Sequence, residues 1–532
     1  MSTMQKTYMT ILNKPWTLSL LSGLSVFLAF EQFGLVPLIL FFPWLFNSMI
    51  LSSENRKQAF ALGFFTSFII MLGGFYWVVY VIHEFGNLSW VLSSFLFLCF
   101  CGFGALNFPV FAVLAQWANR RILRNPSSAL EGFWYVLGLP ALFTLCEWAI
   151  PKLFPWYVGH AFYRQLWLIQ ICEITGATFL TFSLFSIGSF LGWFFNLSSD
   201  KRKSASYFSL IPLSFLCLLV GFSSWTLTKR VFPAGREIKV ALIQANIGNL
   251  DKFRAKSGVL SAVDHVLKTY EEMTREILPQ KPDLILWPET AIPIEMDRPS
   301  LRQNQIHQWV KEWGVPLIAG AYATSPGQVY RNYNSAFLLD PVVSPLRTDV
   351  YNKNILLAFG EYLPLGDTFP ILYRTFPQVS DFARGHDQNI FHLSDGSRLG
   401  ISICYEAIVP SFMRKVGGQG VHALVNLTND SWFGPTSEPH LHGALTVFRA
   451  IEHRAPLMRV TNTGSSFTVS HLGQMSSKSG VYKAESSLRT VTTNASSPTF
   501  YGLYGDWFVL MALFVLAGMA TFVGRTRETV SD

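Results

Sequence analysis

The sequence predicts a polytopic α-helical membrane protein of eight spans that carries one inserted, water-soluble α/β domain. Only 14% of the 532 residues are charged and half are hydrophobic, whereas about 25% of a typical soluble domain is charged. The charges are also unevenly spread, because residues 228–503 hold 50 of the 74 Lys, Arg, Asp and Glu side chains. This composition excludes a disordered or collagen-like chain and argues against a purely soluble protein.

Apolar runs of spanning length lie on both sides of the charged region. A transmembrane helix needs about 20 apolar residues, and one charge at its centre costs about 2.5–3.5 kcal/mol. Three runs, at 59–82, 91–118 and 209–227, contain no charged residue. We predict spans at about residues 15–30, 33–51, 59–82, 88–118, 133–150, 166–196, 208–227 and 506–524.

These spans divide the chain into three parts. Residues 1–227 would hold seven transmembrane helices, residues 228–503 the soluble domain, and residues 504–532 the eighth helix with a short tail. The first apolar run could instead be a cleaved signal peptide, since two lysines precede it. A second apolar run follows after only two polar residues, which favours a retained helical hairpin.

The basic residues predict the orientation of the spans. Lys and Arg cluster before the first span and after the second, fourth, sixth and eighth spans. By the positive-inside rule, both termini are then cytoplasmic and residues 228–503 lie on the outer side. The net charge of +8 divides equally between the soluble domain and the rest of the chain. It therefore reflects topology and does not indicate a nucleic-acid-binding face.

Two acidic residues, Glu147 and Glu173, fall within predicted spans. One interpretation is a path for protons or ions. The interpretation we favour is a carboxyl near the interface or hydrogen-bonded between helices, because no second charge appears at matching depth in the sequence.

Within residues 228–503, short apolar runs alternate with amphipathic stretches. Runs at 237–247, 284–287, 315–321, 399–404 and 423–427 predict buried strands, and stretches at 259–277, 300–313 and 441–454 predict helices. This alternation predicts an α/β domain. Residues 363–384 are rich in Pro and Phe without a clear period, which predicts a long functional loop.

Cys404 is the single cysteine of the soluble domain, since the other five lie in apolar spans. A lone thiol is either a buried small hydrophobe or a reactive nucleophile. Cys404 ends a predicted strand, where α/β domains commonly bind ligands. A nucleophilic thiol needs a base for its proton and a positive group for the oxyanion. Glu289 at the end of another strand and Lys353, whose charge would lower the thiol pKa, are the candidates.

The order Glu289, Lys353, Cys404 resembles the Glu–Lys–Cys triad of the nitrilase-like carbon–nitrogen hydrolases. Four motifs narrow the resemblance to the bacterial apolipoprotein N-acyltransferases: Trp-Pro-Glu at 287–289, Phe-Gly-Glu-Tyr at 359–362, Cys-Tyr-Glu at 404–406 and Asn-Asp-Ser-Trp-Phe-Gly at 429–434. They lie between seven predicted spans and one following span, as in that family. The resemblance implies a nitrilase-like αββα sandwich for the soluble domain.

The resemblance also implies a role for each site residue. Glu289 would be the general base and Lys353 would support the oxyanion, aided by the backbone N–H of Tyr405. Glu361 would orient Lys353 or share in proton transfer. Tyr405 and Glu406 match a motif in which both residues matter to activity.

The implied reaction has two steps and needs no cofactor. Cys404 would take a fatty acyl chain from a membrane phospholipid, which we expect to be phosphatidylethanolamine, and hold it as a thioester. The α-amine of the N-terminal diacylglyceryl-cysteine of an apolipoprotein would then receive it. The implied location is the bacterial inner membrane, with the catalytic domain in the periplasm.

The sequence departs from the family pattern at two positions outside the triad. Phe253 stands where the family usually has Trp, which keeps an aromatic ring but loses the indole N–H donor, and Ala358 replaces a family Pro. Asn334 matches a family motif near the pocket, and the alternative is a turn asparagine.

Two further features have alternative interpretations. His440 and His442 could suggest a metal pair, but no third ligand lies at a suitable spacing, so we predict no metal. Residues 363–376 could form a surface loop, and we favour a lid that dips into the membrane and admits lipid.

Two other functions are alternatives to the acyltransferase. A membrane-anchored nitrilase-type amidase would need only a tether, and eight spans are far more than a tether requires. A polytopic transporter or receptor with a degenerate nitrilase-like sensor domain would be expected to lack at least one triad residue, yet all three are present.

Overall fold

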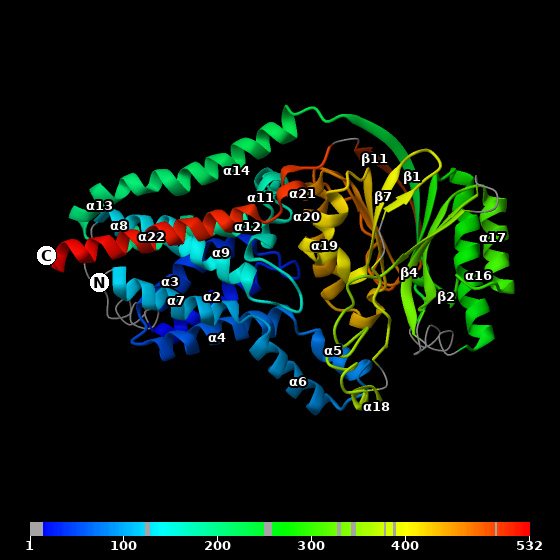
Figure 1. Ribbon diagram of the computed structural model, residues 1–532, viewed down its shortest axis with the longest axis horizontal. Helices are drawn as coiled ribbons and strands as arrows, with labels where there is room; N and C mark the ends of the chain where they lie inside the picture. Colours follow the sequence, from blue (N-terminus) through cyan, green and yellow to red (C-terminus); the bar gives the residue numbers. More distant parts are fainter. Residues whose placement is uncertain are drawn as a thin grey trace, which may run out of the picture. The chain divides into compact units, whose positions relative to one another are not determined.

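The computed structural model describes residues 14–122, 128–248, 258–326, 331–341, 347–376, 379–386, 390–494 and 497–531 (Figure 1). The chain forms two compact units. The first unit comprises Met1–Val79, Val91–Arg230 and Tyr504–Asp532, and the second comprises Tyr80–Trp90 and Val231–Leu503.

The first unit is built from helices. Its α-helices are α2 (Pro15–Phe27), α3 (Phe42–Leu51), α4 (Arg56–Gly74), α6 (Trp90–Phe103), α7 (Asn107–Ile122), α8 (Ser128–Phe133), α9 (Leu139–Ala149), α10 (Leu166–Ile169), α11 (Cys172–Thr175), α12 (Thr178–Asn196), α13 (Ser199–Ala205), α14 (Leu210–Thr228) and α22 (Trp507–Ser531). The short helix α5 (Val78–Glu84) leads into the second unit.

Five helices of the described residues are long and apolar enough to cross a membrane. They are Arg56–Gly74, Trp90–Ile122, Ala129–Ala149, Thr178–Asn196 and Ser199–Thr228. Shorter apolar helices at Pro15–Phe27, Val36–Leu51 and Trp507–Phe522 lie in the remaining three predicted spans. The polytopic helical character is confirmed, and the count of eight spans stays a prediction.

Two predicted spans are interrupted by glycine. The span predicted at 59–82 stops at Gly74, where a Cβ would lie 2.6 Å from a ring carbon of Phe30. The span predicted at 166–196 is broken at Gly176, whose φ of +65° suits glycine. Hydropathy does not register the break after Gly74, because the flanking residues are apolar on both sides.

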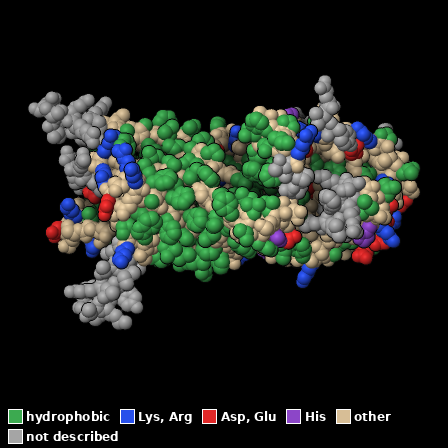
Figure 2. Space-filling view, turned by 90° about the horizontal axis from the view of Figure 1, so that it is seen from below, with side chains coloured by type: hydrophobic (Ala, Val, Ile, Leu, Met, Phe, Trp, Pro, Cys, Tyr) green, Lys and Arg blue, Asp and Glu red, His purple; other side chains and the backbone are tan. Residues whose placement is uncertain are grey.

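The outer surface of the first unit is apolar over most of its length. Large exposed side chains include Trp16, Phe60, Phe95, Leu210 and Phe514, and Figure 2 shows hydrophobic side chains covering this unit. A face of this kind fits contact with lipid chains.

Basic side chains gather at one end of the same unit, where Figure 1 shows α13 (Figures 1 and 2). At this end α7 finishes in Arg120 and Arg121, and α13 carries Arg202 and Lys203.

The structure gives both buried acids of the first unit a partner. Glu173 forms an ion pair with Arg230, and Glu147 Oε1 accepts a hydrogen bond of 2.6 Å from the Val158 N–H. The assumption that no charge accompanies Glu173 is therefore wrong, and the interpretation as hydrogen-bonded carboxyls fits both residues.

The second unit contains two sheets. The six-stranded sheet has the order β11-β1-β2-β3-β4-β5 and the five-stranded sheet has the order β10-β9-β8-β7-β6. The strands are β1 (Ala234–Gln244), β2 (Leu284–Glu295), β3 (Leu317–Thr324), β4 (Asn332–Asp340), β5 (Arg347–Asn352), β6 (Ile390–His392), β7 (Arg398–Ile403), β8 (Ala423–Thr428), β9 (Leu457–Thr461), β10 (Phe467–Val469) and β11 (Glu485–Asn494). The central pairs β1–β2, β2–β3, β7–β8 and β8–β9 are parallel, and the outer pairs are antiparallel.

Helices cover the outer face of each sheet, which makes the αββα sandwich that the family resemblance implies (Figure 1). Helices α16 (Leu260–Ile277) and α17 (Leu301–Trp313) pack on the six-stranded sheet, and α19 (Pro410–Gly417) and α20 (Glu438–His453) pack on the five-stranded sheet. Two short helices, α18 (Ile371–Thr375) and α21 (Phe500–Tyr504), complete the unit.

The helix α16 shows how the sequence pattern builds this core. Its buried residues Val263, Val266, Leu267 and Tyr270 recur at helical spacing. The ring of Tyr270 lies 5.1 Å from that of Trp287 in β2. The strand is thereby held from its helix side, two residues before the carboxylate of Glu289.

We predict that Gly320→Ala destabilises the protein. A Cβ at position 320 in β3 would lie 2.6 Å from both the Glu289 Cα and the Pro288 carbonyl oxygen. Backbone atoms cannot move aside cheaply, so the cost should be about 1–3 kcal/mol, as for other overpacked cores. The measurement is the midpoint of thermal unfolding in detergent. Gly360→Ala is the control, because its Cβ would meet its nearest atom at 3.5 Å, and equal midpoints for the two variants would contradict the prediction.

Candidate active site

The six-stranded sheet presents a buried cluster of polar side chains. Glu289 belongs to β2, Asn334 to β4, and Lys353 directly follows β5. The Lys353 Nζ lies 3.3 Å from Glu289 Oε1, and the Asn334 Nδ2 donates to the same oxygen at 2.7 Å. Glu289 Oε2 accepts a hydrogen bond of 2.8 Å from the backbone N–H of Asn429.

Glu361 completes this cluster from the loop after β5. Its Oε1 accepts hydrogen bonds from Lys353 Nζ at 2.8 Å and from Asn334 Nδ2 at 3.0 Å. Its Oε2 accepts from the Leu357 N–H at 2.8 Å. Lys353 and Asn334 thus each bridge the two carboxylates. Asn334 is a buried strand residue, so the alternative of a turn asparagine does not hold.

Cys404 follows β7 in the five-stranded sheet, as the sequence predicts, and opens the short helix η6 (Cys404–Ile408). The cysteine is 8% exposed and adopts a left-handed backbone conformation with φ of +51°. Its carbonyl oxygen lies 3.3 Å from both Asn426 Nδ2 and His442 Nε2. The charges of Glu289 and Lys353 both act on its thiol, so the structure brings the three predicted triad residues together.

The electrostatics at Cys404 differ from the simple expectation that a nearby lysine lowers its pKa. Burial raises the pKa of the thiol well above its usual value, and the Glu289 charge raises it further. The Lys353 charge lowers the same pKa but does not outweigh these effects. The resting group is therefore a protonated thiol, and a base must take its proton before it can act as a nucleophile.

Lys353 is held in its charged form. Burial by itself lowers the pKa of this ammonium, but the charges of Glu289 and Glu361 outweigh burial and raise its pKa above the ordinary value. A buried cation that stays charged next to the thiol can stabilise a developing oxyanion.

Glu406 connects the cysteine segment to the lysine segment. Its Oε2 accepts from the Ile403 N–H at 2.8 Å, and its Oε1 accepts from the N–H groups of Asn354 and Ile355 at 2.7 and 3.0 Å. The Tyr351 hydroxyl donates to Oε1 at 2.7 Å. Burial raises the pKa of Glu406 to about 7. Its neighbour Tyr405 is half-buried, and burial raises the pKa of that phenol to about 12.

Three residues at the site have a positive φ although none is glycine. They are Thr290 next to Glu289 at +52°, Phe359 before Glu361 at +65°, and Cys404 itself. Such conformations cost about 1–3 kcal/mol each and cluster at functional sites.

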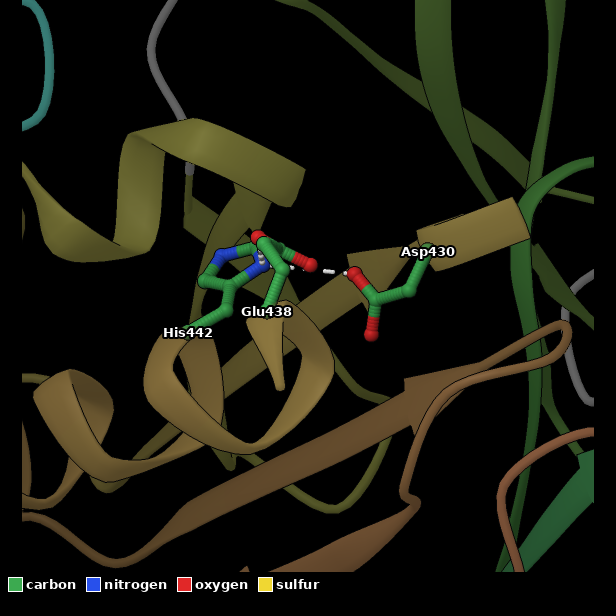
Figure 3. Close-up of side chains that lie close together, drawn as sticks. All are labelled: Asp430, Glu438 and His442. Atoms are coloured by element: carbon green, nitrogen blue, oxygen red, sulfur yellow. Dashed lines mark hydrogen bonds and ion pairs between the residues drawn. The ribbon is translucent and has the colours of Figure 1, made fainter. Parts of the chain in front are cut away.

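The sequence pattern does not predict Glu438 or the contact of Asp430 with His442, whose ring lies beside the backbone carbonyl of Cys404. Asp430, Glu438 and His442 have ligand atoms within 4.8 Å of one another, and all three are buried (Figure 3). The assumption that no third metal-ligand type accompanies His442 is therefore wrong, because Glu438 stands four residues before it on α20. Phe253 lies outside the described residues.

Two family models match the chain. Residues 239–493 match the model of carbon–nitrogen hydrolases, and residues 22–190 match that of the apolipoprotein N-acyltransferase N-terminal domain. An apolipoprotein N-acyltransferase of Bdellovibrio bacteriovorus is 34% identical over 96% of this chain and 95% of its own. The chain belongs to the apolipoprotein N-acyltransferase family.

A second curated relative agrees with the family. An apolipoprotein N-acyltransferase of Geobacter metallireducens is 30% identical over 97% of this chain and 96% of its own. Among solved structures, a nitrilase-superfamily member from Saccharomyces cerevisiae covers 50% of this chain and 92% of its own, with 15% identity and a TM-score of 0.38. As a member of the N-acyltransferase family the chain is an acyltransferase enzyme, which confirms the predicted enzyme class.

We predict opposite shifts in thiol reactivity from two substitutions. Glu289→Gln removes a negative charge that raises the Cys404 pKa, so the rate of alkylation by iodoacetamide should rise at a lower pH than in the wild type. Lys353→Met removes a positive charge that lowers this pKa, so the profile should move to higher pH. The measurement is the alkylation rate at Cys404 against pH, followed by mass spectrometry. Shifts in the same direction would contradict the geometry described above.

We also predict that Asn334→Asp is more harmful than Asn334→Leu. The leucine variant loses one amide that donates to Glu289 and Glu361. The aspartate variant adds a third carboxylate around the single ammonium of Lys353, which is the costly case of a buried unpaired charge. A buried charge left without a partner costs about 3–5 kcal/mol, so the aspartate variant should unfold at a lower temperature than the leucine variant. A more stable Asn334→Asp protein would show that the two carboxylates are not ionised together.

Proposed function

We propose that the chain N-acylates apolipoproteins through a thioester on Cys404, with Glu289 as general base and Lys353 as oxyanion support. The observation that carries the proposal is the buried Lys353–Glu289 ion pair, whose two charges both act on the buried thiol of Cys404 directly after a strand. N-acylation of lipoproteins is the activity of the family to which the chain belongs.

In the first step, Glu289 takes the proton from the Cys404 Sγ, and the sulfur attacks the carbonyl carbon of a phospholipid acyl ester. The tetrahedral oxyanion is stabilised by the Lys353 ammonium and the Tyr405 N–H. Its collapse breaks the ester C–O bond. The lysophospholipid leaves with the proton held by Glu289, and the acyl chain remains as a thioester.

In the second step, the α-amine of a diacylglyceryl-cysteine attacks the thioester carbonyl. Glu289 takes a proton from the amine and returns it to the sulfur as the C–S bond breaks. The product is an amide, and Cys404 is again a thiol. The two carbonyl groups that are attacked belong to an ester and to a thioester, which are already activated. We therefore propose that the reaction uses no cofactor and no metal.

The hydrogen bonds indicate which residues hold the proposed catalytic groups in place. Glu361 and Asn334 hold Lys353 and Glu289 in register, and Glu406 holds the backbone on both sides of the site. We propose a substrate-contacting role for Phe253 from its place in the family pattern.

The membrane setting belongs to the same proposal. We propose eight spans, with residues 1–227 and 504–532 in the membrane part and residues 228–503 as the periplasmic catalytic domain. The basic residues gathered at one end of the helical unit support cytoplasmic termini.

The loop that follows Lys353 exposes large apolar side chains, a feature that fits a lipid substrate. Phe359, Leu365, Phe369 and Ile371 are each more than half exposed, which is unusual for large apolar side chains placed together. We propose that this segment is the lid that contacts lipid, and that the acyl donor is phosphatidylethanolamine.

The test is mass measurement of the detergent-purified chain after incubation with phospholipid vesicles. We expect an added acyl mass on Cys404 with phosphatidylethanolamine, a smaller yield with phosphatidylglycerol, and none in Cys404→Ser. A diacylated lipopeptide should then discharge the adduct and gain the acyl chain. An adduct discharged only to water would indicate a hydrolase, and a Cys404 that stays unmodified would refute the proposed function.

A further inference from the structure

The proposed reaction does not use the buried cluster behind Cys404. His442 Nδ1 lies 3.3 Å from Asp430 Oδ1 and 3.6 Å from Glu438 Oε1, and Figure 3 shows the imidazole and the two carboxyl groups facing one another. The other ring nitrogen, Nε2, lies 3.3 Å from the carbonyl oxygen of Cys404. The imidazole therefore joins the acidic cluster to the nucleophile's backbone.

The cluster already contains its own cation. Arg459 is fully buried, and its Nη2 lies 2.9 Å from Asp430 Oδ2, while its Nη1 donates to Asn426 Oδ1 at 2.5 Å. Gly464 packs against the same carboxylate, since a Cβ added at this glycine would collide with Asp430 Oδ2. A metal ion would have to share Asp430 with the guanidinium, so we interpret the cluster as a proton-sharing network and not as a metal site.

Charge balance restricts where the protons lie. Asp430 and Arg459 neutralise each other, so one proton shared between Glu438 and His442 leaves the whole cluster uncharged, as burial requires. Burial and the Asp430 charge raise the pKa of Glu438, and burial and the Arg459 charge lower the pKa of His442. Both effects favour the proton on Glu438.

The contact to Cys404 then decides the state of the ring. A ring nitrogen without a proton would turn a lone pair toward the carbonyl oxygen. The 3.3 Å contact is favourable when Nε2 carries a proton, which holds for the imidazolium and for the neutral tautomer that faces a protonated Glu438. In both states the Nε2–H donates to the Cys404 carbonyl.

The hydrogen bond from His442 Nε2–H to the Cys404 carbonyl fixes the direction in which the Tyr405 N–H points. The peptide between Cys404 and Tyr405 is planar and trans, so its C=O and N–H point in opposite directions. Fixing the carbonyl toward His442 and Asn426 turns the Tyr405 N–H to the other side of the peptide. Cys404 itself has φ of +51°, a conformation that the backbone does not adopt without such support.

We propose that His442 is a positioning residue, which together with Asn426 holds the 404–405 peptide so that the Tyr405 N–H faces the oxyanion. This inference rests on the proposed function, in which that N–H supports the tetrahedral intermediate. Asp430 and Glu438 act one step further back. An ionised Asp430 accepts from Nδ1–H and so supports the imidazolium, whereas a protonated Glu438 donates to Nδ1 and so supports the neutral tautomer; Nε2 carries a proton in both states.

The test compares two reactions of the same thiol. Acylation by p-nitrophenyl palmitate passes through an oxyanion, whereas alkylation by iodoacetamide does not. His442→Met fills a similar volume without a donor, and we expect it to slow acylation by about 100-fold, the cost of a misplaced catalytic group, with alkylation within about threefold of the wild type. His442→Gln restores an N–H donor and should recover at least tenfold of the loss.

Each result bears on the inference. Acylation of His442→Met at the wild-type rate would overturn it, and so would parallel loss of acylation and alkylation, which shows a structural role only. If His442→Met does not fold, a folded His442→Gln that alkylates normally but acylates about 100-fold slower than the wild type would overturn it as well. A wild-type chain that reacts with the nitrophenyl ester but not with phospholipid would refute the proposed donor and leave the His442 comparison valid.

Discussion

The site depends on one buried ammonium shared by two carboxylates. Lys353 is 1% exposed, and its Nζ contacts Glu361 at 2.8 Å and Glu289 at 3.3 Å. Taking an ion out of water costs several kcal/mol unless it is paired, and two carboxylates this close repel each other without a cation between them. Strand β2, the end of β5 and the loop that carries Glu361 must therefore close around one charge. The same interaction thus positions the proposed general base, Glu289, and the proposed oxyanion support, Lys353.

The nucleophile is held by its backbone from two directions. Glu406 accepts from the Ile403 N–H on one side and from the Asn354 and Ile355 N–H groups on the other, so it links the strand before Cys404 to the segment after Lys353. Behind the cysteine, His442 and Asn426 contact its carbonyl. These contacts offset the cost of a left-handed cysteine, and they tie the two sheets of the sandwich to one catalytic geometry.

The sequence predicts the parts of this structure that arise from periodicity and strand ends. The stripe of α16, the strand before Cys404 and the order of Glu289, Lys353 and Cys404 are all visible in it, because burial on one helix face and at strand ends leaves a regular pattern. Contacts between segments that are distant in the sequence leave no regular pattern. The glycine breaks at Gly74 and Gly176, and the approach of Asp430 to His442, depend on tertiary packing that single-residue patterns do not encode.

The raised pKa of Cys404 connects the site to its surroundings. A thiolate reacts with oxidants far faster than a thiol, and the proposed orientation puts this cysteine in an oxidising compartment without a disulfide partner among the described residues. Burial and the Glu289 charge keep the sulfur protonated at rest. In the proposed mechanism, the nucleophile forms when Glu289 takes the proton as the sulfur attacks the carbonyl group. The carboxylate that suppresses the resting thiolate is thus also the proposed base for the reaction, so protection and activation would not require separate groups.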